Sequence, residues 1–186
     1  TNRTCTKKLK AASSMFMLVP PSLGKRSGAV GGYGGAANIA ILGAGGGQSV
    51  IDLAGIRNSL GIIAGHNQNV RIEGIRFTNM NNNHFIEMDA NLNSVIRDNE
   101  FLGAAGSTRR SAEAVNLDTP DRLTDGFGSK WSNLDTTANQ NILVEGNVFA
   151  NMVRGLGTHN SSGGQYHTGI AVVGNPCNTN CMIAAL

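Results

Sequence analysis

The chain has 186 residues, of which 15 % are charged and 40 % hydrophobic, and its net charge is +3 at pH 7. The length predicts one domain with room for a core, and regularly placed apolar residues exclude an intrinsically disordered chain. With 25 glycines and 22 asparagines, both poor helix formers, the composition argues against a helical protein. It favours many short strands joined by tight turns.

The charge pattern and the lengths of the apolar stretches argue against two classes of partner. Much of the basic excess lies in two short stretches, 7–10 and 24–26, and aromatics are only 5 %. A nucleic-acid surface usually has a denser basic stripe with interleaved aromatics, so we expect no nucleic-acid partner. No stretch is long enough to span a membrane, so we expect no membrane partner either. A modest positive charge suits an acidic polysaccharide.

In chain order, residues 1–37 form an irregular N-terminal part with no clean repeat, in which 14–22 could form a first strand. Alternating segments then begin at 38, 69, 93, 141 and 169, at intervals of 31, 24, 48 and 28 residues. We interpret the interval of 48 as two coils of 24. Phe77, Phe101 and Phe149 fall at equivalent places.

A second alternating series lies between these segments, at 60–66, 84–89, 113–118 and 154–159. A coil of about 24 residues with two or three short strands is typical of a right-handed parallel β-helix. Asn147 and Asn175 are candidates for a hydrogen-bonded ladder between coils. The alternative, a β-sandwich, would show hairpin turns instead of this spacing. We therefore expect an all-β solenoid over 1–186, as a single domain that is a fragment of a longer protein.

Four features lie outside the repeat. Residues 119–140 form a long loop between coils, and such loops on repeat scaffolds commonly build binding sites. The C-terminal end follows a strand with no obvious cap, and open β-helix ends are sticky, so an oligomer through these ends is possible. Cys177 and Cys181 could close a small disulfide loop or could be free thiols. The start at Thr1 fits a removed signal peptide or a fragment.

Stacking the second series gathers polar side chains on one outer face. Three columns result, each with one residue from each of three coils: His84, Glu113 and Arg154; Glu87, Asn116 and Gly157; and Asp89, Asp118 and His159. Strands are about 4.8 Å apart, so neighbouring columns would lie within about one sugar ring of each other. The 119–140 loop and the 160–168 loop begin beside this face. An extended anionic polymer would suit such a groove.

The gathered groups suit β-elimination on a uronic acid. Arg154 can neutralise the carboxylate as a bidentate donor, helped by Asn116. His159, His167 or Lys130 can remove the proton at C5, and Tyr166 can protonate the leaving oxygen. The remaining expected contacts to substrate come from His84, Glu87, Glu113, Asp118 and from Trp131, whose ring offers an apolar face to a sugar.

Other interpretations remain open. Glu113 and Arg154 could form a structural ion pair, His84 could pack or cap a strand, and Asp118 could be a turn residue. No cofactor is required, although the oxygen-rich segment 118–125 could bind Ca²⁺. A glycoside hydrolase would need two carboxylates about 5–10 Å apart, for which Glu87 or Glu113 with Asp118 could serve. A C5 epimerase, or a non-catalytic carbohydrate-binding or adhesion β-helix, are further alternatives.

Segments within 60–175 resemble the pectin lyase-like superfamily, and most of all bacterial secreted polysaccharide lyases of the alginate-lyase type. The specific parts are "HFIE", "EAVNLD", "RGLGTH" and "YH". The resemblance implies a secreted lyase whose metal is optional, acting on acidic polysaccharide in a long groove. It implies binding or catalytic roles at His84, Glu113, Asp118, Arg154, His159 and His167. The N-terminal third matches poorly, which leaves the activity of this piece open.

Overall fold

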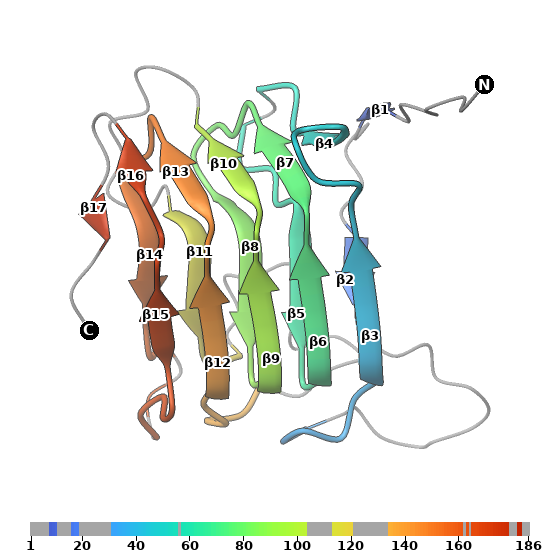
Figure 1. The fold of residues 1–186 in the computed structure, drawn as a ribbon. Helices are drawn as coiled ribbons and strands as arrows, with labels where there is room; N and C mark the ends of the chain where they lie inside the picture. Colours follow the sequence, from blue (N-terminus) through green and yellow to red (C-terminus); the bar gives the residue numbers. More distant parts are fainter. Residues whose placement is uncertain are drawn as a thin grey trace.

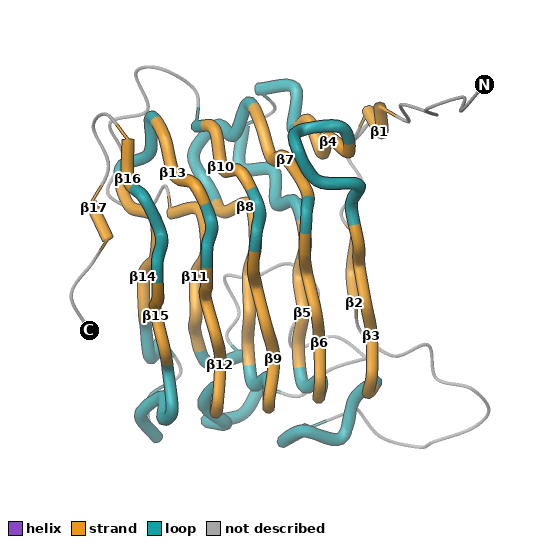
Figure 2. Tube along the Cα trace, viewed as in Figure 1, coloured by secondary structure: helices purple, strands orange, loops and turns teal. Residues whose placement is uncertain are grey.

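The structure is a computed structural model that describes residues 8–10, 16–18, 31–55, 57–103, 113–120, 134–161, 163, 165–178 and 182–183. These residues form strands and no helix, arranged in three parallel sheets (Figures 1 and 2). Because the described part holds no helix, it holds none that could cross a bilayer.

Each sheet takes one strand from every turn of the chain. Sheet 1 contains β1 (Lys8–Lys10), β4 (Ser49–Asp52), β7 (Ile75–Thr78), β10 (Glu100–Leu102), β13 (Val148–Ala150) and β16 (Cys177–Asn178). Sheet 2 contains β2 (Phe16–Leu18), β5 (Ile62–Gly65), β8 (His84–Asp89), β11 (Glu113–Asp118), β14 (Arg154–Thr158) and β17 (Met182–Ile183). Sheet 3 contains β3 (Ala37–Leu42), β6 (Gln68–Glu73), β9 (Leu92–Arg97), β12 (Gln140–Glu145) and β15 (Ala171–Val173).

The connectivity is that of a solenoid. The chain visits the three sheets in turn, and each strand pairs in parallel with the strand three places earlier, as β7 with β4 and β10 with β7. This arrangement is compatible with the expected parallel β-helix. β2 lies within the 14–22 segment in which a first strand was expected.

The core consists of side chains that point inward from all three sheets. Phe77, Phe101 and Phe149 are paired in register, and their rings stack with centroids 5.0 and 5.1 Å apart. All three side chains are fully buried. Their alignment confirms the predicted equivalence, and it follows from the sheet geometry, since the same position of each coil lies directly above the previous one.

The 48-residue interval is one coil, and its interpretation as two coils of 24 is wrong. β12 pairs directly with β9, with Gln140 opposite Leu92. Among the described residues, the intervening chain supplies β10 and β11 to that coil. The longer interval in the sequence leaves the pairing of β9 with β12 intact, and repeat folds commonly accept insertions within one repeat.

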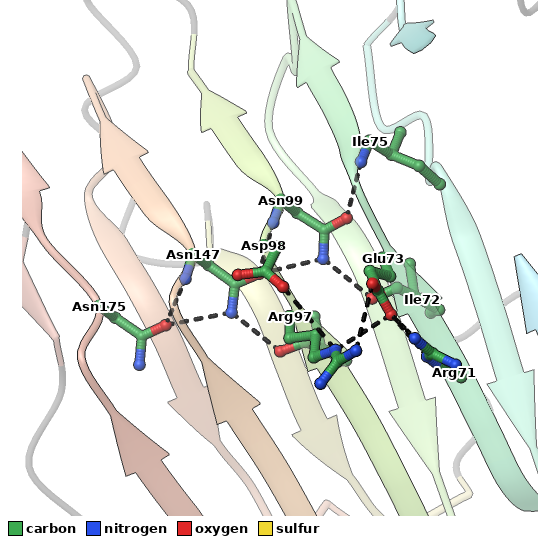
Figure 3. A network of polar contacts seen from close by, with 10 residues as sticks. Arg71, Ile72, Glu73, Ile75, Arg97, Asp98, Asn99, Asn147 and Asn175 are labelled. Carbon is green, nitrogen blue, oxygen red and sulfur yellow. Dashed lines mark hydrogen bonds and ion pairs between the residues drawn. The ribbon is translucent and has the colours of Figure 1, made fainter. Parts of the chain in front are cut away.

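Asparagines link the coils where sheet 3 turns into sheet 1; Asn99 and Asn147 are buried, and Asn175 is partly buried. Asn99, Asn147 and Asn175 form a hydrogen-bonded ladder, which we call the second asparagine ladder because another one, described below, lies at an earlier turn of each coil (Figure 3). The main-chain N–H of Asn147 donates to Asn175 Oδ1 at 2.9 Å, and the main-chain N–H of Asn99 donates to Asn147 Oδ1 at 3.0 Å. The expected ladder at Asn147 and Asn175 is therefore confirmed, and it extends by one further coil.

The segment before β12 is tied to the first described coils. The Gly32 N–H donates to Asp135 at 2.8 Å, and the Tyr33 hydroxyl donates to the carbonyl of Ala138 at 2.6 Å. Within the expected 119–140 loop, residues 119–120 and 134–139 are described, and β12 begins at Gln140. Cys177 is disulfide-bonded, and both other cysteines lie outside the described residues.

Candidate active site on sheet 2

The strands β8, β11 and β14 place the predicted columns side by side. Glu113 pairs with His84 on one side and with Arg154 on the other. Asn116 lies between Glu87 and Gly157 in the same way. The strand register therefore agrees with the register expected from the sequence, because the alternation of each strand fixes which residues share a face.

One buried carboxylate collects three partners. Glu113 is fully buried, and its Oε1 accepts a hydrogen bond from Arg154 Nη1 at 2.7 Å. His159 Nε2 lies 3.1 Å from Oε1 and 3.2 Å from Oε2 of Glu113. His84 Nδ1 lies 3.5 Å from Oε2. We call these four residues the Glu113 cluster.

The cluster shifts the pKa of three of its members in ways that follow from burial and charge. The hydrogen bond to Glu113 raises the pKa of His159 above its usual value, against the effect of burial. Burial lowers the pKa of His84, and the Glu113 charge offsets only part of that. Burial also opposes ionisation of Glu113, but hydrogen bonds from His159 and Arg154 outweigh it and lower its pKa. His159 therefore holds the proton more readily than His84.

Exposure separates the members of the cluster. The side chains of Arg154 and His159 are 29 % and 38 % exposed, whereas that of Glu113 is 1 % exposed. Arg154 and His159 can therefore meet a ligand, and Glu113 lies beneath them. Glu113 was expected to contact substrate, but in the structure its side chain is buried and Arg154 and His159 bind over it.

Gly157 makes room for the buried carboxylate. A Cβ atom at Gly157 would lie 2.4 Å from Cδ of Glu113 and 2.5 Å from its Oε1. Any side chain at this position would therefore displace Glu113 from Arg154 and His159. Sequence reasoning placed Gly157 in the correct column but did not assign it a role, because a steric requirement for glycine has no signature in a single sequence.

A second buried polar group adjoins the cluster. Glu87 Oε1 accepts a hydrogen bond from Asn116 Nδ2 at 2.9 Å, and Glu87 Oε2 lies 3.6 Å from His84 Nε2. Glu87 and Asn116 are 2 % and 4 % exposed. The imidazole of His84 thus lies between two buried carboxylates, those of Glu87 and Glu113. The structure brings these residues together, as expected, but beneath the surface.

Asp118 organises the loop that follows β14. Its Oδ1 accepts hydrogen bonds from the amides of Thr119, at 2.7 Å, and Ser161, at 2.8 Å, and its Oδ2 accepts from the Ser161 hydroxyl at 2.5 Å. This geometry matches the turn role that the sequence left open for Asp118. Ser161 was missed, since nothing in its sequence context marks it.

His167 has both ring nitrogens engaged by the main chain. Its Nδ1 accepts a hydrogen bond from the main-chain N–H of Asn139 at 2.9 Å. Its Nε2 lies 2.7 Å from the carbonyl oxygen of His159 and 3.0 Å from that of Leu117. The ring therefore lies directly behind the main chain of His159, and neither nitrogen is open to a substrate.

Tyr166, the predicted acid, is not part of the Glu113 cluster. Tyr166 is 84 % exposed, and no hydrogen bond joins its hydroxyl to the described residues. Lys130 and Trp131, the expected base and sugar platform, lie outside the residues that the structure describes. Within the described ranges, no group of three or more His, Cys, Asp or Glu side chains is arranged to hold a metal ion.

The site therefore offers a guanidinium and an imidazole side by side, both half-exposed and both anchored on one buried carboxylate. Such a pair can bind an anion through Arg154 and exchange a proton through His159. No protein-family model, no curated protein and no solved structure matches the chain.

Proposed function

We propose that the protein is a polysaccharide lyase that cleaves an alginate-like, uronic-acid-containing polysaccharide by β-elimination. The observation that carries the proposal is the shared anchoring of Arg154 and His159 on Glu113, with both side chains accessible. The reaction needs a cation for the uronate carboxylate and a base for the neighbouring C–H bond.

The proposed scaffold is a right-handed parallel β-helix of the pectin lyase-like kind. The three stacked parallel sheets support a β-helix, and crossover connections between parallel strands are right-handed in about 98 % of cases. We also propose that the protein is secreted. The disulfide at Cys177 supports this, since disulfides persist mainly in oxidising compartments.

In the proposed reaction, Arg154 binds the uronate carboxylate and stabilises the charge that develops on it. Only its Nη1 is engaged by Glu113 among the described residues, so its other N–H groups remain for substrate. His159 then accepts the proton from C5. The electrons of the C5–H bond form the C4–C5 double bond as the C4–O bond breaks. The leaving oxygen takes a proton from solvent or from the exposed hydroxyl of Tyr166.

Glu113 supports this reaction without touching the substrate. It accepts the Nε2–H of His159, which leaves Nδ1 as the nitrogen that carries a lone pair. A carboxylate behind a histidine fixes its tautomer and orientation and increases its basicity. Glu113 is therefore a positioning residue in the proposal.

The alternative of a glycoside hydrolase fits the geometry less well. It needs two carboxyl groups that reach the glycosidic bond, but Glu87, Glu113 and Asp118 are each 5 % exposed or less. A C5 epimerase shares the proton abstraction at C5 and differs only in its product. The experiment below separates these activities.

The test is the ultraviolet absorbance of unsaturated uronate ends, measured on alginate, pectate, glucuronan and hyaluronan with and without a chelator. We expect absorbance to rise on one polymer. The rate of this rise should be at least about 100-fold lower in both His159→Ala and Arg154→Ala. The matched control is Arg71→Ala, which removes an exposed arginine on sheet 3 that pairs with Glu73.

Each outcome has a distinct meaning. A rise that a chelator abolishes would add the Ca²⁺ requirement that the sequence left open. No rise from folded protein on any polymer contradicts the lyase. Reducing ends without unsaturation would then identify a hydrolase, exchange of the C5 proton without cleavage would identify an epimerase, and binding without products would identify a carbohydrate-binding module.

A further inference from the structure

Buried asparagines also link the coils at the turn from sheet 2 to sheet 3. Asn67, Asn91 and Asn139 form this first asparagine ladder, and each is fully buried. The side-chain oxygens of Asn67 and Asn139 each accept a main-chain N–H from the preceding coil: Ala36 donates to Asn67 at 3.1 Å, and Asn91 donates to Asn139 at 2.9 Å. We call each asparagine of the ladder a rung. An oxygen acceptor that faces the preceding coil is the first property of a rung.

The side-chain nitrogens of Asn91 and Asn139 each donate to two main-chain carbonyls. Asn139 Nδ2 donates to Met88 O at 2.8 Å in the preceding coil and to Asp118 O at 2.9 Å in its own. Asn91 Nδ2 does the same with Ala64 at 2.6 Å and Asp89 at 3.2 Å. This pair of donated bonds is the second property of a rung.

His167 has both properties. Its Nδ1 accepts a hydrogen bond from the main-chain N–H of Asn139. Its Nε2 faces the carbonyl oxygens of Leu117 in the preceding coil and of His159 in its own coil. Leu117 pairs in register with Met88. The two carbonyls are therefore those that the next asparagine of the ladder would bind.

The backbone places His167 at the same position as the asparagines. The residue after each rung donates its N–H to the carbonyl of the previous rung: Gln140 to Asn91 at 2.9 Å, and Thr168 to Asn139 at 3.1 Å. Gln140 and Thr168 also form a parallel bridge. The match thus holds for the acceptor, for the donor and for the main chain.

We propose that His167 is the rung that follows Asn139 in the first asparagine ladder, and that it acts as a positioning residue for His159. An imidazole with a bare Nδ1 and a protonated Nε2 reproduces the acceptor and donor of an asparagine amide. In this state His167 binds the His159 carbonyl and holds the main chain that carries the proposed base. This assignment rests on the proposed function for its catalytic consequence, but not for the ladder itself.

The decisive comparison is His167→Asn against His167→Ala. Asparagine restores an acceptor for the Asn139 amide and a donor for the carbonyls, but it cannot accept a substrate proton. We expect H167N to melt within about 2 °C of the wild type and H167A to melt about 3–10 °C lower, because buried main-chain groups lose their partners. These measurements need no substrate.

The effect on His159 is measured by NMR titration of its ring protons. The raised pKa of His159 depends on its contact with Glu113. We expect it to persist in H167N and to move toward the ordinary histidine value in H167A. ¹⁵N shifts of His167 should show a bare Nδ1 and a protonated Nε2 in the wild type.

Lyase activity then tests the catalytic consequence. We expect H167N to retain activity within about threefold of wild type, and H167A to lose at least about tenfold. A stable H167N that is as inactive as H167A would overturn the proposal and make His167 the base. An H167N as unstable as H167A, or the opposite tautomer, would overturn the rung itself. If wild type shows no lyase activity, the proposed function fails, while melting and NMR still decide whether His167 is a rung.

Discussion

At the scale of single residues, the burial of Glu113 decides how the site behaves. A buried carboxylate is costly unless it is paired and hydrogen-bonded. Here Arg154 and His159 both bind it directly, and its pKa is lowered despite its burial. Glu113 therefore stays ionised at neutral pH and controls the protonation of His159.

The first prediction concerns the pH dependence of the rate. In the proposed reaction the base is neutral His159, whose pKa is raised by Glu113. The acidic limb of the kcat/KM profile should therefore lie above the pH expected for an ordinary histidine. Glu113→Gln removes the negative charge, so the limb should move to lower pH. A limb that stays in place in E113Q would show that another group is the base.

The same pKa shifts set a window of stability. The interaction of His159 with Glu113 stabilises the folded protein fully below the ordinary pKa of histidine. This stabilisation is lost as pH rises through the raised pKa of His159. Ionised Glu113, whose pKa is lowered, stabilises the folded protein above the ordinary glutamate pKa. This stabilisation is lost as pH falls through the lowered pKa. Neutral His84 acts in the direction opposite to His159, since its pKa is lowered.

The second prediction concerns Gly157. A Cβ there would lie 2.4 Å from Cδ of Glu113, so Gly157→Ala should push the carboxylate away from Arg154 and His159. We expect the protein to lose about 1–3 kcal/mol of stability, because a buried charge loses its partners, together with most of its activity. Urea unfolding and the absorbance assay measure both. Ala171→Ser, at an exposed position of β15, serves as the control and should change neither.

At the scale of elements, the asparagine ladders hold one coil to the next. Asn147 is fully buried and hydrogen-bonds to the coils on both sides, through Asn99, Ile96 and Asn175 (Figure 3). An amide suits this position because it offers a donor and an acceptor together. The sequence indicated Asn147 and Asn175, which lie two residues after the ends of β12 and β15, and Asn99 has the same place after β9.

The third prediction tests the ladder directly. Asn147→Ala should cost about 1–3 kcal/mol for each buried main-chain group that it leaves without a partner. Asn81→Ala is the matched control, because Asn81 also donates to a carbonyl, that of Gly55, but at an exposed site. We expect the control to cost less than about 1 kcal/mol, since water replaces its bond. Equal losses in both variants, measured by urea unfolding, would contradict a special role for the buried ladder.

At the scale of the whole molecule, sheet 3 ends in two strands that have a partner on one side only. β3 pairs only with β6, and β15 only with β12, among the described strands. Leu42 on β3 is 59 % exposed, and Val173 on β15 is 51 % exposed. Unpaired strand edges with apolar side chains favour pairing with another chain.

The fourth prediction follows from these edges. We expect the protein to self-associate with rising concentration in sedimentation velocity, and Val173→Lys to reduce the association, because an edge lysine opposes strand pairing. Leu143→Lys introduces the same charge on β12, which has partners on both sides, and should leave association unchanged. If both variants act alike, the face of sheet 3 and not its edge is responsible.

The sequence by itself determined the repeat, the phenylalanine stack and the strand register that places His84, Glu113 and Arg154 in one column. These follow from local alternation, which a parallel stack carries from coil to coil. It could not determine that 93–140 is one coil, because a long connection and a missing strand leave the same gap in the spacing.

Only the tertiary structure decided which polar residues are accessible. Alternation places Glu113 and Arg154 on the same outer face, but their depth depends on Gly157 and on the residues that bind over the carboxylate. It also decided the role of His167. The chemistry of a histidine is the same in a loop and in a ladder, and only the Asn139 amide and the His159 carbonyl, brought to its two nitrogens by the stacking of coils, distinguish the two.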